Sequence, residues 1–475
     1  MRRLLLLTLV CLCAACTTAP VKPIGLTPSP TALAPTVAAT SIATTAPAVD
    51  LAPPADLAPP VNLAPPVNLA PYRAAMKPEF AAEVDRFGSV PQYQIDLTIA
   101  PDLKSYSATQ VVTYTNVETV PLNEVYFSLF ANLDSYGGNL QVDTLHVNGQ
   151  DVKPIYEEDN SALKVPLAQP LLPGQSIVIE MTYTGDMPTA DVERGYNQFG
   201  LHDNILALPN FYPQIPAYDQ RGWNIERGPG YGDAVFSDTA LYQVNIAAPT
   251  DQVVATSGVC DRAGTETTTV YHCVSGPMRD FMIAMSSDYQ VKSDTIDGIK
   301  VNSYYRPDFA DEGTRGLQVV TDAVRSYEKR IGAYPFNELD LMATPTTAGG
   351  IEYPGLIVVA EGLYGRNPTF YESATAHETA HQWWYSLVGD DQIHDPWLDE
   401  ALTQFTTALY FRDEYGAEGM QNYVAQALQI GYDRVKGTAE DKRADLPVAA
   451  YDEGQYSAIV YEKAPLFFNA IYDEI

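Results

Sequence analysis

Apolar and polar residues alternate along much of the first half of the chain. The clearest run is Tyr93, Ile95, Leu97 and Ile99, and the same alternation returns at 177–183 and 242–246. A period of two places successive side chains on opposite faces of a strand. Gly, Asn and Pro separate these runs. The pattern therefore predicts antiparallel sheets packed in layers.

From about residue 295 the period changes to that of a helix. Its apolar positions, which fall on one helical face, are Leu317, Val320, Val324, Tyr327 and Ile331. A short apolar strand at 339–344 follows. A chain of 475 residues is long enough for two or three domains. We therefore predict a multidomain β plus α/β protein, with an N-terminal β-sandwich or saddle domain at 76–292 and a mixed α/β domain at 293–475.

The first sixteen residues have the pattern of a secretion signal. Arg2 and Arg3 form a basic end, residues 4–12 are apolar, and two alanines precede Cys16. This arrangement resembles a bacterial lipoprotein signal, in which the cysteine carries lipid. It predicts an extracytoplasmic protein held on a lipid bilayer through Cys16. An ordinary secreted protein is the alternative.

Residues 17–75 are rich in Pro, Ala and Thr and contain almost no charge. From Leu51 the phrases LAPPAD, LAPPVN, LAPPVN and LAP recur every six residues. Such repeats favour polyproline II, a semi-rigid spacer of about 3 Å per residue. We predict a linker over this range, and a ligand for proline-binding domains is the alternative.

The charge balance is acidic, with 28 Lys and Arg against 59 Asp and Glu. Such a surface repels phosphate backbones, so we expect no nucleic-acid partner. Two of the five cysteines, Cys260 and Cys273, flank a Gly/Thr-rich segment. In an oxidising compartment we expect them to form a disulfide across a hairpin, with a zinc site as the weaker alternative.

The sequence HETAH begins at His377. Residues four apart lie on one face of a helix, so His377 and His381 can bind one zinc ion (Zn2+), with Glu378 beside it as the base that activates water. Two surface histidines are the competing interpretation, which the neighbouring apolar residues Trp383 and Trp384 disfavour.

Zinc catalysis requires three protein ligands and one open position. Glu400, in WLDEALTQF, follows His381 after eighteen intervening residues. Apolar residues surround it, which predicts a second buried helix. A buried carboxylate without a partner is costly, and binding to zinc removes that cost. Glu400 is therefore the expected third ligand.

Together HETAH, the eighteen-residue gap and WLDEA resemble the aminopeptidase N family of gluzincin zinc metallopeptidases, which includes the leukotriene hydrolases. The resemblance implies a thermolysin-like catalytic domain after the β domain. GGIEYPG then matches the family's amine-binding motif, so that Glu352 binds the substrate's α-amine and the backbone of Gly349 and Gly350 lines the cleft. Tyr461, before Lys463, becomes the oxyanion donor.

The family's second amine anchor has no clear match here, and Gln198 and Gln214 are weak candidates. Tyr456 and His394 are further residues that could reach the cleft. The expected activity is removal of N-terminal residues from peptides by a zinc aminopeptidase. An endopeptidase, a non-catalytic lipoprotein scaffold and an epoxide hydrolase are the alternatives. The sequence does not indicate an oligomeric state.

Overall fold

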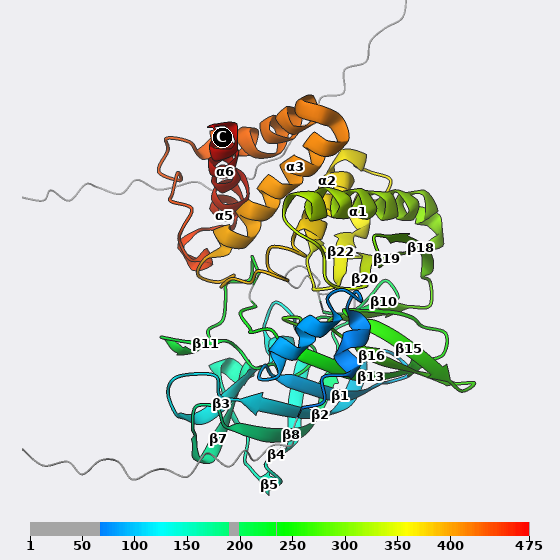
Figure 1. Cartoon of the computed structure of the whole chain (residues 1–475), viewed down its shortest axis with the longest axis vertical. Helices are drawn as coiled ribbons and strands as arrows, with labels where there is room; N and C mark the ends of the chain where they lie inside the picture. Colours follow the sequence, from blue (N-terminus) through cyan, green and yellow to red (C-terminus); the bar gives the residue numbers. More distant parts are fainter. Residues whose placement is uncertain (1–66, 190–198, 234, 475) are drawn as a thin grey trace, which may run out of the picture. The chain divides into compact units, whose positions relative to one another are not determined.

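The computed structural model describes residues 67–189, 199–233 and 235–474, all within one compact unit (Figure 1). The predicted signal at 1–16, most of the predicted linker and Gln198 lie outside these residues. The described part begins with a short helix, η1 (Pro71–Ala75), in which Tyr72 is fully buried and accepts a hydrogen bond from Gln243. Packing against the β domain therefore starts inside the range 17–75 predicted as linker.

The β domain is built around one eight-stranded sheet. In spatial order its strands are β15 (Val259–Gly264), β16 (Thr268–Val274), β13 (Leu241–Pro249), β1 (Gln92–Ile99), β2 (Ser105–Thr115), β8 (Ser176–Asp186), β4 (Asn139–Val147) and β5 (Gln150–Asp151). The alternation expected from the sequence is present in β1, β8 and β13, whose apolar side chains are buried. The predicted disulfide joins Cys260 in β15 to Cys273 in β16.

Smaller sheets pack around this large one. They are β3 (Leu122–Ser128) with β7 (Ala162–Leu171) and β6 (Ile155–Glu157); β14 (Val253–Thr256) with β17 (Ile283–Ser286), β10 (Ile205–Leu208) and β9 (Gly200–His202); and β11 (Tyr218–Asp219) with β12 (Gly222–Trp223). The described part of the domain also contains the short helices η1, η2 (Ala81–Phe87), η3 (Phe130–Asn132) and η4 (Glu158–Asn160).

The antiparallel sheets predicted from the sequence include one parallel pair among the named strands of the β domain. Strands β1 and β13 pair in parallel, with Gln92 opposite Leu241. Parallel neighbours require a long connection between them. The chain between residues 100 and 240 supplies it, and short-range alternation cannot reveal such a pairing.

The α/β domain has a five-stranded sheet with the order β18 (Gln290–Ile296), β19 (Ile299–Tyr305), β20 (Glu338–Thr344), β22 (Leu356–Ala360) and β21 (Gly350–Ile351). Because β18 pairs with β19, this sheet begins at Gln290, slightly before the predicted boundary at 293. Helices α1 (Ala310–Arg330) and α2 (Pro368–Ala380) lie beside each other over the sheet (Figure 1). α1 carries the apolar face expected from the sequence.

The rest of the domain is helical. Its elements are η5 (Pro307–Phe309), η6 (Glu361–Leu363), α3 (Pro396–Tyr423), η7 (Val424–Gln429), α4 (Ile430–Val435), η8 (Val448–Ala450), α5 (Glu453–Tyr456), η9 (Ser457–Lys463) and α6 (Ala464–Glu474). η7 and η9 are π-helical turns. No helix among the described residues is long and apolar enough to span a bilayer.

A partly buried arginine, Arg279, fixes the β domain against the loop that follows α2. Arg279 Nε donates a hydrogen bond of 2.7 Å to the carbonyl of Tyr385, and its Nη1 donates to the carbonyl of Ser237. A Cβ on Gly389 would lie 1.8 Å from the guanidinium carbon, so a larger residue there would displace the Arg279 side chain. This contact holds the loop between the two metal-ligand segments in place.

Candidate metal centre and substrate cleft

Helix α2 carries the HETAH residues. Asn367 caps its first turn by accepting a hydrogen bond from the backbone N–H of Phe370. His381 is the residue just after Ala380 and keeps helical angles, φ −61° and ψ −15°. One helical turn therefore separates the two histidine rings, whose centroids are 4.7 Å apart. Trp383 lies beyond the helix end and not in it.

Helix α3 brings Glu400 to these histidines. The two Nε2 atoms are 3.1 Å apart, and Glu400 Oε2 lies 3.3 Å from that of His377 and 3.5 Å from that of His381. Donor atoms at tetrahedral zinc, each about 2.0–2.2 Å from the ion, are about 3.3–3.5 Å apart. Glu400 Oε2 is buried and accepts no hydrogen bond from the residues that the structure describes. The donor set fits a zinc ion.

Asp399, beside Glu400, orients one of the ligands. Its Oδ1 lies 2.6 Å from His381 Nδ1, which leaves His381 Nε2 free to bind metal, and both side chains are 1% exposed. Gln392 Nε2 donates to Asp399 Oδ2 at 2.8 Å and to Glu352 Oε1 at 2.9 Å. Sequence reasoning missed both roles. The position of Asp399 next to Glu400 was an available signal, whereas nothing in the sequence marks Gln392.

Glu378 faces the same cleft from α2 and is nearly fully buried. Burial raises the pKa of its carboxyl well above the usual value, although His381 acts in the opposite direction. Strand β21 passes directly over it: a Cβ on Gly350 would lie 2.4 Å from the Glu378 side chain. Glycine at 350 is therefore required for the strand to approach the candidate base.

Glu352 follows β21 and is 6% exposed. Burial raises its pKa well above the usual value, with Asp399 and Glu400 adding to the effect and His381 opposing it. Asp233, from the β domain, lines the cleft beside Glu352; burial raises the pKa of Asp233, and the carboxylate of Glu352 adds to this effect. Within the described ranges neither carboxylate pairs with Lys or Arg. No motif or spacing in the sequence marks Asp233 as a cleft residue.

Tyr461 lies on the π-helical turn η9 and donates a hydrogen bond to Glu400 Oε1. Burial raises its pKa well above the usual value. Tyr456 also lines the cleft, with its ring centroid 5.6 Å from that of Tyr461. The structure thus brings both tyrosines to the ligand set.

The cleft has a volume of about 610 Å³ and contains all the residues proposed from the sequence as ligands, base, amine-binding residue and oxyanion donor. Two weaker candidates lie elsewhere. Gln214 is buried and hydrogen-bonded to Asn210 and Ser237. His394 contacts Asp391 at 2.8 Å and Glu226 at 3.0 Å and does not line the cleft.

Two histidines one helical turn apart and a glutamate from the next long helix form the ligand set of a gluzincin zinc metallopeptidase. Comparison with known proteins agrees: residues 316–474 match the peptidase family M1 domain. This part of the chain is therefore similar to the catalytic domain of the M1 family, the aminopeptidase N family.

Several M1 proteins are similar to the chain. It is 33% identical over 192 residues to human endoplasmic reticulum aminopeptidase 2, covering 38% of this chain and 20% of that protein. It is 25% identical over 288 residues to aminopeptidase M1-B of Oryza sativa subsp. japonica, covering 57% and 32%. The matched regions are thus a third or less of these relatives' length.

A similar solved structure is the M1 zinc metallopeptidase of Deinococcus radiodurans. It has a TM-score of 0.60 and 19% identity, and the match covers 82% of this chain and 83% of that one. A variant of that protein was crystallised with the substrate Tyr-Ser-Ala. At this level of identity the likeness shows a shared fold.

Proposed function

We propose that the chain is a zinc-dependent aminopeptidase that removes N-terminal residues from peptides. The observation that carries this proposal is the pair of carboxylates, Glu352 and Asp233, beside the metal ligands. Burial and mutual repulsion make two negative charges there unfavourable, and a substrate ammonium group would neutralise them. The names of the relatives, which are aminopeptidases, support the same activity.

His377, His381 and Glu400 would hold the zinc ion, which supplies Lewis acidity that activates water and polarises a carbonyl group. Glu378 accepts the water proton and then delivers it to the leaving amine. A carboxyl whose pKa is raised by burial holds a proton more readily than an ordinary glutamate, which suits both transfers. Such general acid–base catalysis contributes about 10² to 10⁴ in rate.

Tyr461 would donate a hydrogen bond to the substrate's carbonyl oxygen as negative charge develops there. Its hydroxyl already reaches Glu400, so it lies close enough to the ligands to contact a carbonyl held beside them. Glu352 and Asp233 fix the α-amine, and Gly349 and Gly350 leave the cleft wall open to the peptide backbone. The first peptide bond is then the one presented for hydrolysis.

The test compares matched peptides with free and acetylated N-termini. Wild type is expected to cleave the free-amine peptide and to leave the acetylated one nearly intact. Glu352→Gln keeps an acceptor for Gln392 but removes the charge. Since charge-assisted hydrogen bonds contribute about 1.5–3 kcal/mol, kcat/KM for the free-amine peptide should fall about 10- to 150-fold. Asp233→Asn should act in the same direction.

Glu453→Gln is the matched control. Glu453 is an exposed carboxylate that lines the same cleft, so its loss tests whether any negative charge has the same effect. We expect a change of less than about threefold, since exposed charges are screened. The opposite result is equal cleavage of both peptides by wild type, with neither rate changed in Glu352→Gln. That result would identify an endopeptidase.

We also propose that the protein acts outside the cytoplasm, anchored to a lipid bilayer through Cys16 with residues 17–66 as a spacer. The signal-like residues 1–16 support this, as does the disulfide between Cys260 and Cys273, since disulfides persist in oxidising compartments. Cys16→Ser should abolish incorporation of labelled fatty acid and move the protein from the membrane to the soluble fraction. A wild-type protein that is already soluble and unlabelled would indicate simple secretion.

A further inference from the structure

A second, smaller cavity lies beside the cleft, at the carboxylate pair. The two spaces share Gly232, Asp233, Ile351 and Glu352 in their linings. The smaller cavity has a volume of about 40 Å³ and extends between the β domain and the loop after α2, where Tyr385 and Gln392 border it. It therefore begins where an α-amine would be held and leads away from the metal ligands.

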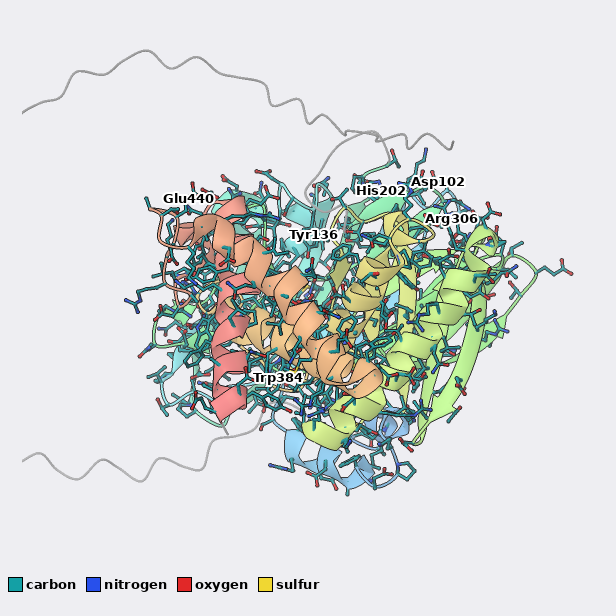
Figure 2. All side chains as sticks on the ribbon, turned by 90° about the horizontal axis from the view of Figure 1, so that it is seen from above. Asp102, Tyr136, His202, Arg306, Trp384 and Glu440 are labelled. Carbon is teal, nitrogen blue, oxygen red and sulfur yellow. A yellow bond between two sulfur atoms is a disulfide. The ribbon has the colours of Figure 1, made fainter. Side chains whose placement is uncertain are left out.

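The walls of this cavity are mostly apolar and firmly packed. Tyr136, labelled in Figure 2, packs against Phe130 and Phe199 with ring centroids 6.2 and 6.1 Å apart. Tyr353 is held by its carbonyl, which accepts a hydrogen bond from Gln382. The packing behind Tyr136 resists widening of the cavity on that side, because buried side chains are close-packed.

One polar group of the wall lacks a partner. The hydroxyl of Tyr353 is buried and makes no hydrogen bond within the described residues, and Tyr353 as a whole is 5% exposed. A buried hydroxyl without a partner is costly. A ligand group or a water molecule in the cavity would satisfy it.

The volume limits what can enter. A water molecule requires about 10–15 Å³ measured in this way, so about 40 Å³ holds roughly three non-hydrogen atoms. The side chains of alanine, serine, threonine and valine are of this size or smaller. Those of phenylalanine, tryptophan and arginine are about twice as large or more.

We propose that this cavity receives the side chain of the substrate's N-terminal residue and selects peptides that begin with a short, uncharged residue. The proposal rests on the proposed aminopeptidase function, because the α-amine held at Glu352 and Asp233 directs the adjacent side chain into the cavity. Tyr136 and Ile351 set the size limit, and the Tyr353 hydroxyl accommodates serine or threonine as well as alanine.

The first experiment measures kcat/KM for tripeptide amides that differ only in the first residue: Ala, Ser, Val, Phe and Arg. We expect the first three to lie within about tenfold of one another, and Phe and Arg to lie at least tenfold below Ala. Cleavage of the Phe or Arg peptide at a rate within threefold of the Ala peptide overturns the size limit. Failure to cleave any of the peptides would count against the proposed function itself.

The second experiment changes the cavity. Tyr136→Leu and, separately, Ile351→Ala should raise the Phe-to-Ala ratio of kcat/KM at least fivefold by enlarging the cavity. Tyr126→Leu is the matched control: Tyr126 is a buried tyrosine of β3 in the same domain that does not line the cavity, and this ratio should stay unchanged. An unchanged ratio in both folded cavity variants, checked by thermal melting, would refute the assignment.

The hydroxyl is tested by Tyr353→Phe, which keeps the ring. The Ser-to-Ala ratio of kcat/KM should fall about two- to tenfold, the range expected for one neutral hydrogen bond. The Val-to-Ala ratio should not change. A Ser-to-Ala ratio equal to that of wild type would remove Tyr353 from side-chain recognition.

Discussion

Asp399→Asn is predicted to weaken zinc binding without disturbing the three ligands. Asp399 Oδ1 accepts a hydrogen bond of 2.6 Å from His381 Nδ1, and Oδ2 accepts one of 2.8 Å from Gln392. Asn has one acceptor and one donor in place of two acceptors. It must therefore turn its NH2 group toward either His381 or Gln392, both of which are donors here.

The magnitude follows from the charge and the burial of this pair. A charge-assisted hydrogen bond contributes about 1.5–3 kcal/mol and a neutral one about 0.5–1.5 kcal/mol, so replacing the carboxylate costs about 1–1.5 kcal/mol at His381 alone. Asp399 and His381 are each 1% exposed, so solvent screens little of the lost charge. The mismatch at Gln392 adds to this loss. We expect a 10- to 100-fold weaker zinc affinity, about 1.4–2.7 kcal/mol.

The assay is competition for zinc against a chelator of known affinity, with the variant's folding checked by circular dichroism. Thr403→Val is the matched control. Thr403 Oγ1 also lies near His381 Nδ1, at 3.2 Å, but this contact is neutral and longer, so its loss should change the affinity less than threefold. If the zinc affinity of Asp399→Asn is within twofold of the wild-type affinity, the orientation of His381 by Asp399 does not contribute to metal binding.

Three further predictions concern activity and stability. Glu378→Gln should lower the rate of hydrolysis at least tenfold while the zinc content stays near one per chain, because Glu378 is proposed as a base. Loss of zinc from this variant would indicate that Glu378 is a ligand. Tyr461→Phe should lower kcat about 10²- to 10³-fold with little change in melting temperature, and an unchanged kcat would exclude the oxyanion role. Burial raises the pKa of Asp280 to about 7, although the hydroxyl of Tyr385 and Arg279 lower it. Protonated Asp280 therefore adds roughly 4 kcal/mol to the free energy of unfolding. This contribution is complete below about pH 4 and is lost as the pH rises through about 7. The free energy of unfolding, measured with urea at pH 5 and pH 8, should fall less between these pH values in Asp280→Asn than in wild type. An equal fall in both proteins would contradict the raised pKa of Asp280.

The sequence by itself determined the features that depend on local periodicity and fixed spacing. The alternation around Tyr93 predicted a strand, because side chains alternate across any strand. The four-residue spacing of His377 and His381 predicted a shared metal, because one helical turn places both rings on one face. The resemblance carried by GGIEYPG and by Tyr461 predicted further cleft residues, and these line the cleft together with the ligands.

Tertiary structure alone decided which distant residues complete the site. Asp233 reaches Glu352 from the β domain, and Gln392 bridges Glu352 and Asp399 from a loop held by Arg279. No periodic pattern marks such residues, because their positions depend on how two domains pack and not on a local repeat. The same reason explains the parallel pairing of β1 with β13: segments separated by a long connection meet only once the whole domain has folded.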